Sequence, residues 1–113
     1  RPRQEALLAW VYGRMVQVCR EHAALPVWVG LPPIDMRASE DEAPVAARLA
    51  AEAGFVVVRL DHVYDGVDPA TISVTHTNHH PNRKGTRLIA DALHRALLEH
   101  AAEVPFHLPV PAP

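Results

Sequence analysis

Apolar residues recur at helical spacing near the start of the chain. From Gln4 to Ala24 they lie at steps of three and four: Leu7, Leu8, Val11, Met15, Val18 and Cys19. Such spacing places them on one face of an amphipathic helix. We therefore predict a helix over Gln4–Ala24 that ends before Pro26.

Two short apolar runs predict β-strands. Val27–Leu31 (VWVGL) is closed by Pro32 and Pro33, as expected for a short buried strand. Phe55–Leu60 (FVVVRL) is almost entirely β-branched or aromatic, which favours a strand. Its apolar character is nearly unbroken, and this predicts burial on both faces, as in a parallel sheet.

A second helix is predicted between the two strands. Ser39 and Glu42 have the spacing of a capping box, in which each side chain satisfies a backbone N–H of the first turn. A narrow apolar stripe follows, and Gly54 supplies the C-terminal stop. The stripe consists of Val45, Ala46, Leu49, Ala50 and Ala53.

The last third of the chain contains a long connection and a final helix. Asp61–His80 has no clean period, and a connection of about twenty residues is longer than packing requires, which is typical of a functional loop. The helix is predicted over Pro81–His100, with Pro81 at its first position. Its buried face would contain Leu88, Ile89, Ala92, Leu93, Ala96 and Leu97. The proline-rich stretch that follows predicts an extended tail over residues 105–113.

The element order is helix, strand, helix, strand, loop, helix. Alternation of this kind predicts an α/β fold with a parallel sheet and right-handed crossovers. Two parallel strands cannot bury both faces of a sheet. We therefore expect residues 1–104 to form the C-terminal part of a larger α/β domain whose other strands lie upstream.

Composition narrows the possible functions. The 113 residues suit one domain, and 11 basic against 13 acidic residues give a net charge of −2, without the basic patch expected of a nucleic-acid-binding protein. No apolar run is long enough to span a membrane. The single Cys19 cannot form an internal disulfide, and its place on a helix face predicts an inert buried thiol. The opening RPRQEALL has neither an initiating Met nor a signal sequence, so any targeting signal would lie upstream.

Three histidines, His76, His79 and His80, crowd the end of the long loop. Ligands of open α/β sheets bind where the carboxyl ends of the strands continue into loops, and this loop leaves such an end. His80 lies directly before the predicted helix. Its imidazole can act as a general base if another group fixes its tautomer and orientation.

The segment HHPNRKGTRLIADAL resembles the last conserved block of the SGNH (GDSL-type) esterase and lipase superfamily. The matching positions are His80, Pro81, Asn82, Gly85, Leu88, Ile89 and Ala90. The resemblance covers roughly Gln4–His100 and is most specific in Asn78–Ala90. It implies a three-layer α/β/α flavodoxin-like fold, of which this chain is the C-terminal part.

The resemblance also implies serine-hydrolase chemistry without a cofactor. A serine would attack the ester bond of a small-molecule or carbohydrate substrate, and His80 would act as the general base. A hydrolase and an acyltransferase fit equally well. The family's nucleophile would lie upstream, because Ser39 is explained as a helix cap and Ser73 lacks a nucleophile-elbow context. The chain alone is therefore expected to lack hydrolase activity.

The expected acid is also missing, because Thr77 and Asn78 occupy the positions where the family carries a carboxylate. Asn78 can orient the imidazole, although an amide cannot offset its positive charge. Alternatively, Asp61, Asp65 or Asp68 folds back to do so, or the enzyme works as a Ser-His dyad, or it is an inactive relative.

Other interpretations stay open beside the hydrolase. The missing carboxylate is compatible with a non-catalytic module that binds a partner or carbohydrate. His76, His79 and His80, with His62, could bind a metal, although no His-Glu-x-x-His pattern is present. Simple structural or solvated roles are predicted for the remaining notable residues: Asn82 and Gly85 at the helix start, the basic residues Arg83, Lys84 and Arg87, His94 and His100, and Trp10 and Trp28 as core or interface anchors.

Overall fold

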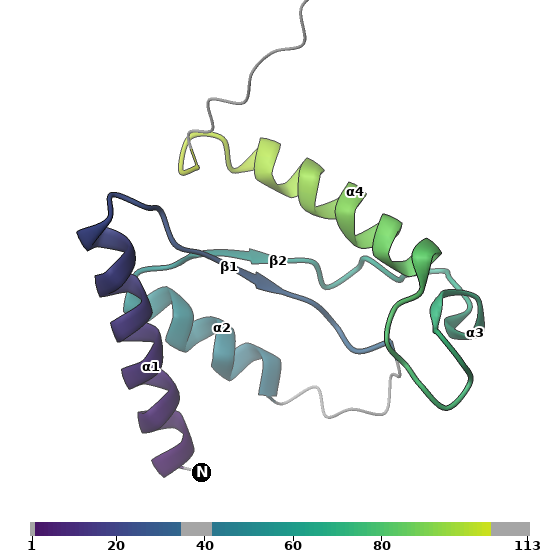
Figure 1. The fold of residues 1–113 in the computed structure, drawn as a ribbon, viewed down its shortest axis with the longest axis horizontal. Coiled ribbons are helices and arrows are strands. Elements are labelled where there is room, and N and C mark those ends of the chain that lie inside the picture. The colour runs from purple at the N-terminus through teal and green to yellow at the C-terminus, as the bar shows by residue number, and fades with distance from the viewer. Residues whose placement is uncertain (1, 35–41, 105–113) are drawn as a thin grey trace, which may run out of the picture.

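A computed structural model describes residues 2–34 and 42–104 of the chain. The elements follow in the order α1 (Pro2–Glu21), β1 (Val27–Gly30), α2 (Glu42–Ala53), β2 (Val56–Arg59), α3 (Pro69–Ile72) and α4 (Arg83–Glu99) (Figure 1). The fold is mixed α/β, as predicted. Ser39 of the predicted capping box lies outside the described residues.

The strands β1 and β2 form a parallel pair. Val27 is opposite Val56, and the register continues to Gly30 opposite Arg59. Both strands are shorter than predicted. Val58 is fully buried, but the valines before it are half-buried and Arg59 is exposed. The prediction that β2 is buried on both faces is therefore wrong for the described part of the chain, since two strands offer too little surface to cover each other.

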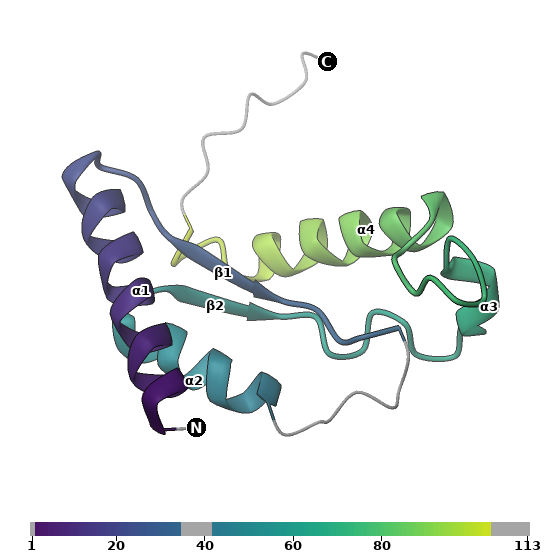
Figure 2. The ribbon, with the colours of Figure 1, turned by 60° about the horizontal axis from the view of Figure 1, so that its bottom comes forward.

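Helices lie on both sides of the strand pair. Figures 1 and 2 show α2 on one side of the strands and α4 on the other. On the α2 side, α1 packs against α2 and reaches the sheet through Tyr12. The Tyr12 ring meets Phe55 edge to face, with 5.4 Å between the centroids, and Trp28 Nε1 donates a hydrogen bond of 2.9 Å to the Tyr12 hydroxyl.

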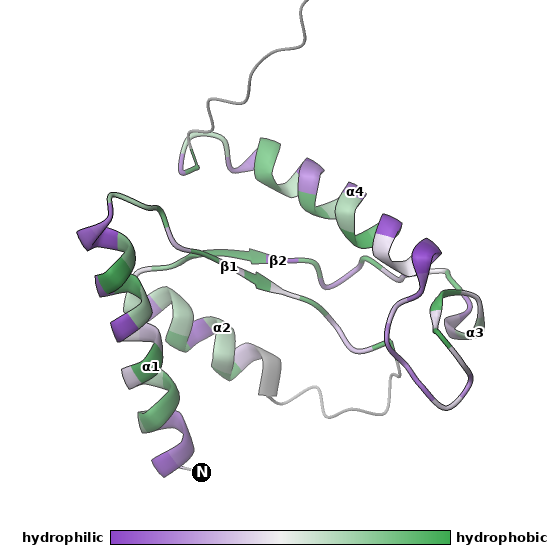
Figure 3. Ribbon diagram, in the orientation of Figure 1, coloured by the Kyte–Doolittle hydropathy of each residue, from purple (hydrophilic) through white to green (hydrophobic). Residues whose placement is uncertain are grey.

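Only half of the apolar face of α1 is covered. Val16 is buried, and Leu8, Tyr12 and Cys19 are partly buried. Four residues predicted on the buried face are exposed instead: Leu7, Val11, Met15 and Val18. Figure 3 shows apolar residues along much of α1. The helix carries a broad apolar arc, and α2 contacts one side of it. Within the described residues, the other side is not buried.

Two further side chains of this region differ from their predicted burial. Cys19 is only partly buried, so its thiol is less protected than predicted. Trp10 is 65% exposed, so it is not a core residue of the described structure and only its interface role stays a prediction, while Trp28 is partly buried.

Local backbone chemistry explains where the helices begin and end. Gly54 ends α2 with a φ of 110°, as predicted. The end of α1 comes earlier than predicted, because Ala23 adopts a left-handed φ of 52° and the Ala24 N–H bonds back to the Cys19 carbonyl at 2.8 Å. This hydrogen bond is typical of a Schellman motif, which reverses the chain before Pro26 is reached.

The connection after β2 contains the short helix α3, which the periodicity did not predict. Asp68 caps α3, because its Oδ1 accepts from the Ala70 N–H at 3.0 Å, and Pro69 is the first helical residue. An Asp-Pro pair is a recognised helix-start signal. The connection is therefore more ordered than its lack of period indicated.

Among the described helices, none combines the length and the apolar character needed to cross a membrane.

Replacing Ala23 by Gly is expected to raise the free energy of unfolding by about 0.5–1 kcal/mol, because a Cβ in the left-handed region costs more than the extra entropy of an unfolded glycine. Urea denaturation of the two proteins measures the difference. Ala24→Gly is the matched control, since Ala24 does not have a positive φ, and it is expected to give no gain. Equal destabilisation by both changes would contradict this explanation of the α1 terminus.

Candidate functional site

The predicted site lies on a hairpin-like loop between α3 and α4. Ser73 and Pro81 form an antiparallel bridge, flanked by hydrogen bonds from Val74 N–H to the His80 carbonyl (2.9 Å) and from Asn82 N–H to the Ile72 carbonyl (2.8 Å). The flanking residues Val74 and Asn82 donate the hydrogen bonds of this pairing, so it does not require an N–H from Pro81. Pro81 therefore lies in the bridge rather than at the first position of the helix, which corrects the predicted helix start. We call residues 73–81 the histidine hairpin.

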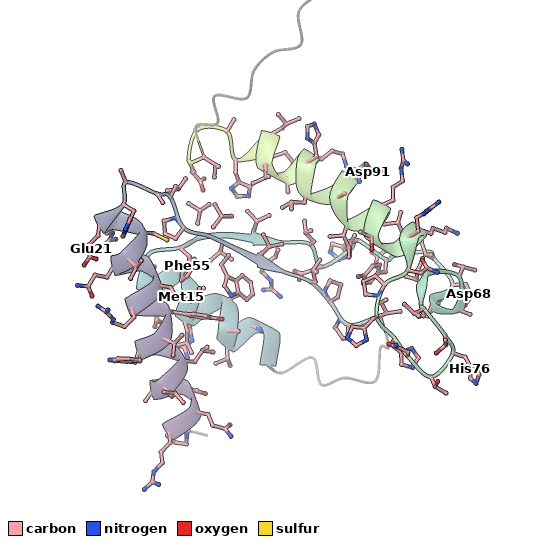
Figure 4. All side chains as sticks on the ribbon, viewed as in Figure 1. Met15, Glu21, Phe55, Asp68, His76 and Asp91 are labelled. Carbon is pink, nitrogen blue, oxygen red and sulfur yellow. The ribbon has the colours of Figure 1, made fainter. Side chains whose placement is uncertain are left out.

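A tight turn closes the tip of the histidine hairpin. The main chains of Thr75 and Asn78 exchange two hydrogen bonds of 3.3 Å. The Asn78 N–H also lies 2.9 Å from the Thr75 hydroxyl, which is itself 3.3 Å from the Thr77 hydroxyl. His76 is at the outer end of the hairpin (Figure 4). These contacts fix the backbone of Asn78.

Asn78 holds one nitrogen of the His80 ring. Its Oδ1 accepts a 3.2 Å hydrogen bond from the His80 main-chain N–H and lies 2.6 Å from His80 Nδ1. A main-chain N–H can only donate, so the amide oxygen faces His80. Because that oxygen can only accept, Nδ1 carries the hydrogen. In the neutral imidazole Nε2 is then the basic nitrogen.

The second nitrogen of this ring is available. His80 is exposed, and within residues 2–34 and 42–104 no hydrogen bond to its Nε2 is found. An imidazole held at Nδ1 with a basic Nε2 open to solvent has the geometry of a general base.

The three aspartates considered as alternative orienters are engaged elsewhere. Asp61 pairs with Arg59 at 3.2 Å, and Asp65 lies 2.9 Å from His62 Nδ1. Asp68 caps α3. Among the candidate orienters, Asn78 is the one that contacts His80 in the described structure.

The structure does not gather the histidines into a metal centre. His62 is paired with Asp65, and His76 is at the hairpin tip. Within the described residues no group of three or more His, Cys, Asp or Glu side chains could hold a metal ion. Elsewhere in the connection after β2, burial raises the pKa of the Tyr64 phenol above its usual value.

Ser73 does not supply a nucleophile. Its side chain is almost completely buried, and its Oγ donates a 2.8 Å hydrogen bond to the Pro69 carbonyl. Ser39 lies outside the described residues. The described part of the site thus contains a general-base geometry without an available serine nucleophile.

Asn82 joins the histidine hairpin to both flanking helices. Its Oδ1 caps α4 by accepting from the Gly85 N–H at 3.0 Å. Its Nδ2 donates to the carbonyls of Thr71 and Ser73 at 3.0 and 3.1 Å. Gly85 is buried there, and a Cβ at this position would lie 2.8 Å from the Ile72 carbonyl oxygen. As predicted, both residues build the scaffold.

Sequence reasoning missed the role of Thr75, the residue that fixes Asn78. The available signal was the spacing of Thr75 and Asn78, because both residue types favour turns in which a side chain bonds to a nearby main-chain group.

No family model, curated protein or solved structure matches this chain.

Gly85→Ala is expected to lower the free energy of unfolding by about 1–3 kcal/mol, because the added methyl group overlaps a main-chain oxygen that cannot move freely. Thermal or urea denaturation measures the loss. Gly13→Ala is the control: a Cβ there meets no atom within 4 Å, so this helix-interior change should stabilise by about 0.5–1 kcal/mol. A neutral Gly85→Ala change would contradict the close approach of α4 to Ile72.

Asn78→Ala is expected to change the tautomer of His80. In the unsubstituted chain the Nδ1–H form should dominate, and without the Asn78 oxygen the Nε2–H form should increase. Long-range ¹H–¹⁵N spectra at about pH 9, where an ordinary imidazole is neutral, measure the two forms. His94, an exposed residue of α4, should show no change in either protein. Identical His80 tautomer populations would show that Asn78 does not orient the ring.

Proposed function

We propose that this chain supplies the general-base part of an SGNH-type serine hydrolase or acyltransferase that acts on esters. One observation carries the proposal: Asn78 Oδ1 lies 2.6 Å from His80 Nδ1, while the ring remains exposed. The resemblance of HHPNRKGTRLIADAL to the last conserved block of that superfamily is a second support for the proposal.

In the proposed mechanism His80 moves one proton twice. Nε2 removes the hydroxyl proton of a serine as that serine attacks the ester carbonyl, and then gives the proton to the departing alcohol. For hydrolysis, Nε2 next takes a proton from water as the water attacks the acyl-enzyme carbonyl, and it gives this proton to the serine oxygen as the serine–acyl bond breaks and the acid leaves. Throughout, Nδ1–H stays on Asn78 Oδ1, so the ring cannot rotate away from the reacting atoms.

The serine and the oxyanion donors would come from the remainder of a three-layer flavodoxin-like domain. The exposed stripe of α1 and the two-stranded sheet support this part of the proposal. A parallel sheet is stable when helices and further strands cover it. Added strands would cover Leu7, Val11, Met15 and Val18.

A non-catalytic relative is the second candidate, and the neutral Asn78 favours it. An amide positions the imidazole but cannot offset the charge it gains during catalysis. Ester hydrolysis by the full-length protein, lost on changing His80, would exclude this candidate.

In the full-length protein, His80→Ala is expected to lower kcat for p-nitrophenyl acetate by about 10²–10⁴-fold, the usual contribution of a general base. Asn78→Asp should raise kcat by at least about tenfold, since a carboxylate in the same place keeps the contact and stabilises the imidazolium. His76→Ala, at the hairpin tip, is the matched control and should leave the rate unchanged. Equal rates for the His80→Ala and His76→Ala proteins would reject His80 as the base.

A further inference from the structure

The first two turns of α4 carry three cationic side chains close to His80. Arg83, Lys84 and Arg87 are all exposed, and none forms an ion pair within the described residues. The first turn of α4 contains no acidic residue. Cations near a helix N-terminus oppose the helix dipole, so helix stability does not explain this placement.

Two of these cations border an open groove. By groove we mean a shallow, largely open surface of about 550 Å³ on the exposed face of α4 alone, lined by Arg83, Thr86, Arg87, Ala90 and Asp91. Asp91, its single carboxylate, is on the side of α4 that faces away from the strands (Figure 4). Two guanidinium groups against one carboxylate leave the groove with a net positive charge, and Lys84 adds to it.

The chain path keeps this groove near the candidate base. Arg83 follows His80 by three residues, and three residues of extended chain span at most about 11 Å. A ligand that contacts both His80 and Arg83 would have to span this separation between its ester bond and its charged group.

The side chain that orients His80 carries no negative charge. Asn78 is neutral, and Asp61, Asp65 and Asp68 are held by Arg59, His62 and the α3 N-terminus. During the proposed reaction the imidazole becomes positive as well. Between Ser73 and Ala90, the segment that contains the hairpin and the start of α4, the Asp, Glu, Lys and Arg residues are Arg83, Lys84 and Arg87, all of them positive.

We propose that the substrate is an ester with its own anionic group, a carboxylate, phosphate or sulfate, which Arg83 and Arg87 hold in the groove. Guanidinium groups suit all three anions, because they bind paired oxygens with a fork of N–H donors. This inference rests on the proposed function, which it extends to the class of substrate.

The test compares matched anionic and neutral esters with the full-length protein. Mono-p-nitrophenyl succinate against p-nitrophenyl butyrate tests an anion on the acyl side, and 4-acetoxybenzoate against phenyl acetate tests one on the alcohol side. In at least one pair, kcat/KM of the anionic ester should exceed that of the neutral ester by about tenfold or more at low salt. The preference should shrink as salt screens the charges.

The double variant Arg83→Gln/Arg87→Gln should abolish the preference, so that kcat/KM of the anionic ester falls to about that of its neutral partner. Arg95→Gln, on the last turns of the same helix, is the control and should keep the preference for the anionic ester. A preference for neutral esters in both pairs, or one for anionic esters that survives the double variant, would overturn the proposal.

An NMR titration with the anion of monomethyl succinate separates this proposal from the proposed function. Amide shifts at Arg83 and Arg87 that disappear in the double variant would support the groove even if no ester were hydrolysed. Ester hydrolysis without an anion preference would reject the groove alone. Absence of both binding and hydrolysis would reject the groove and the proposed function together.

Discussion

The histidine hairpin depends on the side chain of Asn82. Its three hydrogen bonds, to the Gly85 N–H and to the carbonyls of Thr71 and Ser73, connect the end of α3, the hairpin and the start of α4. Each of these main-chain groups is at an element end, where regular helical bonding no longer satisfies it. The Asn82 amide thus satisfies three main-chain groups and also fixes the position of the hairpin arm that carries His80.

The orientation of His80 follows from this anchoring through local contacts. The bridge between Ser73 and Pro81 brings the two hairpin arms together, and the tip turn fixes Asn78 through Thr75. Asn78 Oδ1 then receives both the main-chain N–H and the ring Nδ1 of His80. The Asn78 amide sets the tautomer and orientation of His80. Because this amide is neutral, it adds no charge that would stabilise a protonated imidazole.

The sequence predicted the parts of the fold that depend on short-range pattern. The parallel valine-rich strands, the stop at Gly54 and the scaffold role of Asn82 and Gly85 follow from residue type and spacing. The end of α1 at Ala23 was missed because alanine rarely adopts a left-handed φ. The helix α3 was missed because four residues show no period, although Asp68 and Pro69 signalled its start. At the site, the pattern singled out His80 and Asn78 but left their contact undecided, since three aspartates nearby could also have folded back.

The burial of α1 shows a limit of pattern reasoning that has a physical cause. Periodicity identifies the apolar arc of a helix but not which side of that arc finds a partner. Here α2 covers the side with Val16, while Leu7 and Met15 remain exposed. Apolar surface of this extent is unfavourable in water, and the strand pair is too narrow to cover it. Within the described residues, His80 likewise has no serine available as a nucleophile, because the Ser73 hydroxyl is buried and bonded to Pro69. Further strands that carry a serine would cover the exposed apolar face of α1 and would also supply His80 with a nucleophile. The proposed domain is therefore the simplest structure in which every described element has a role.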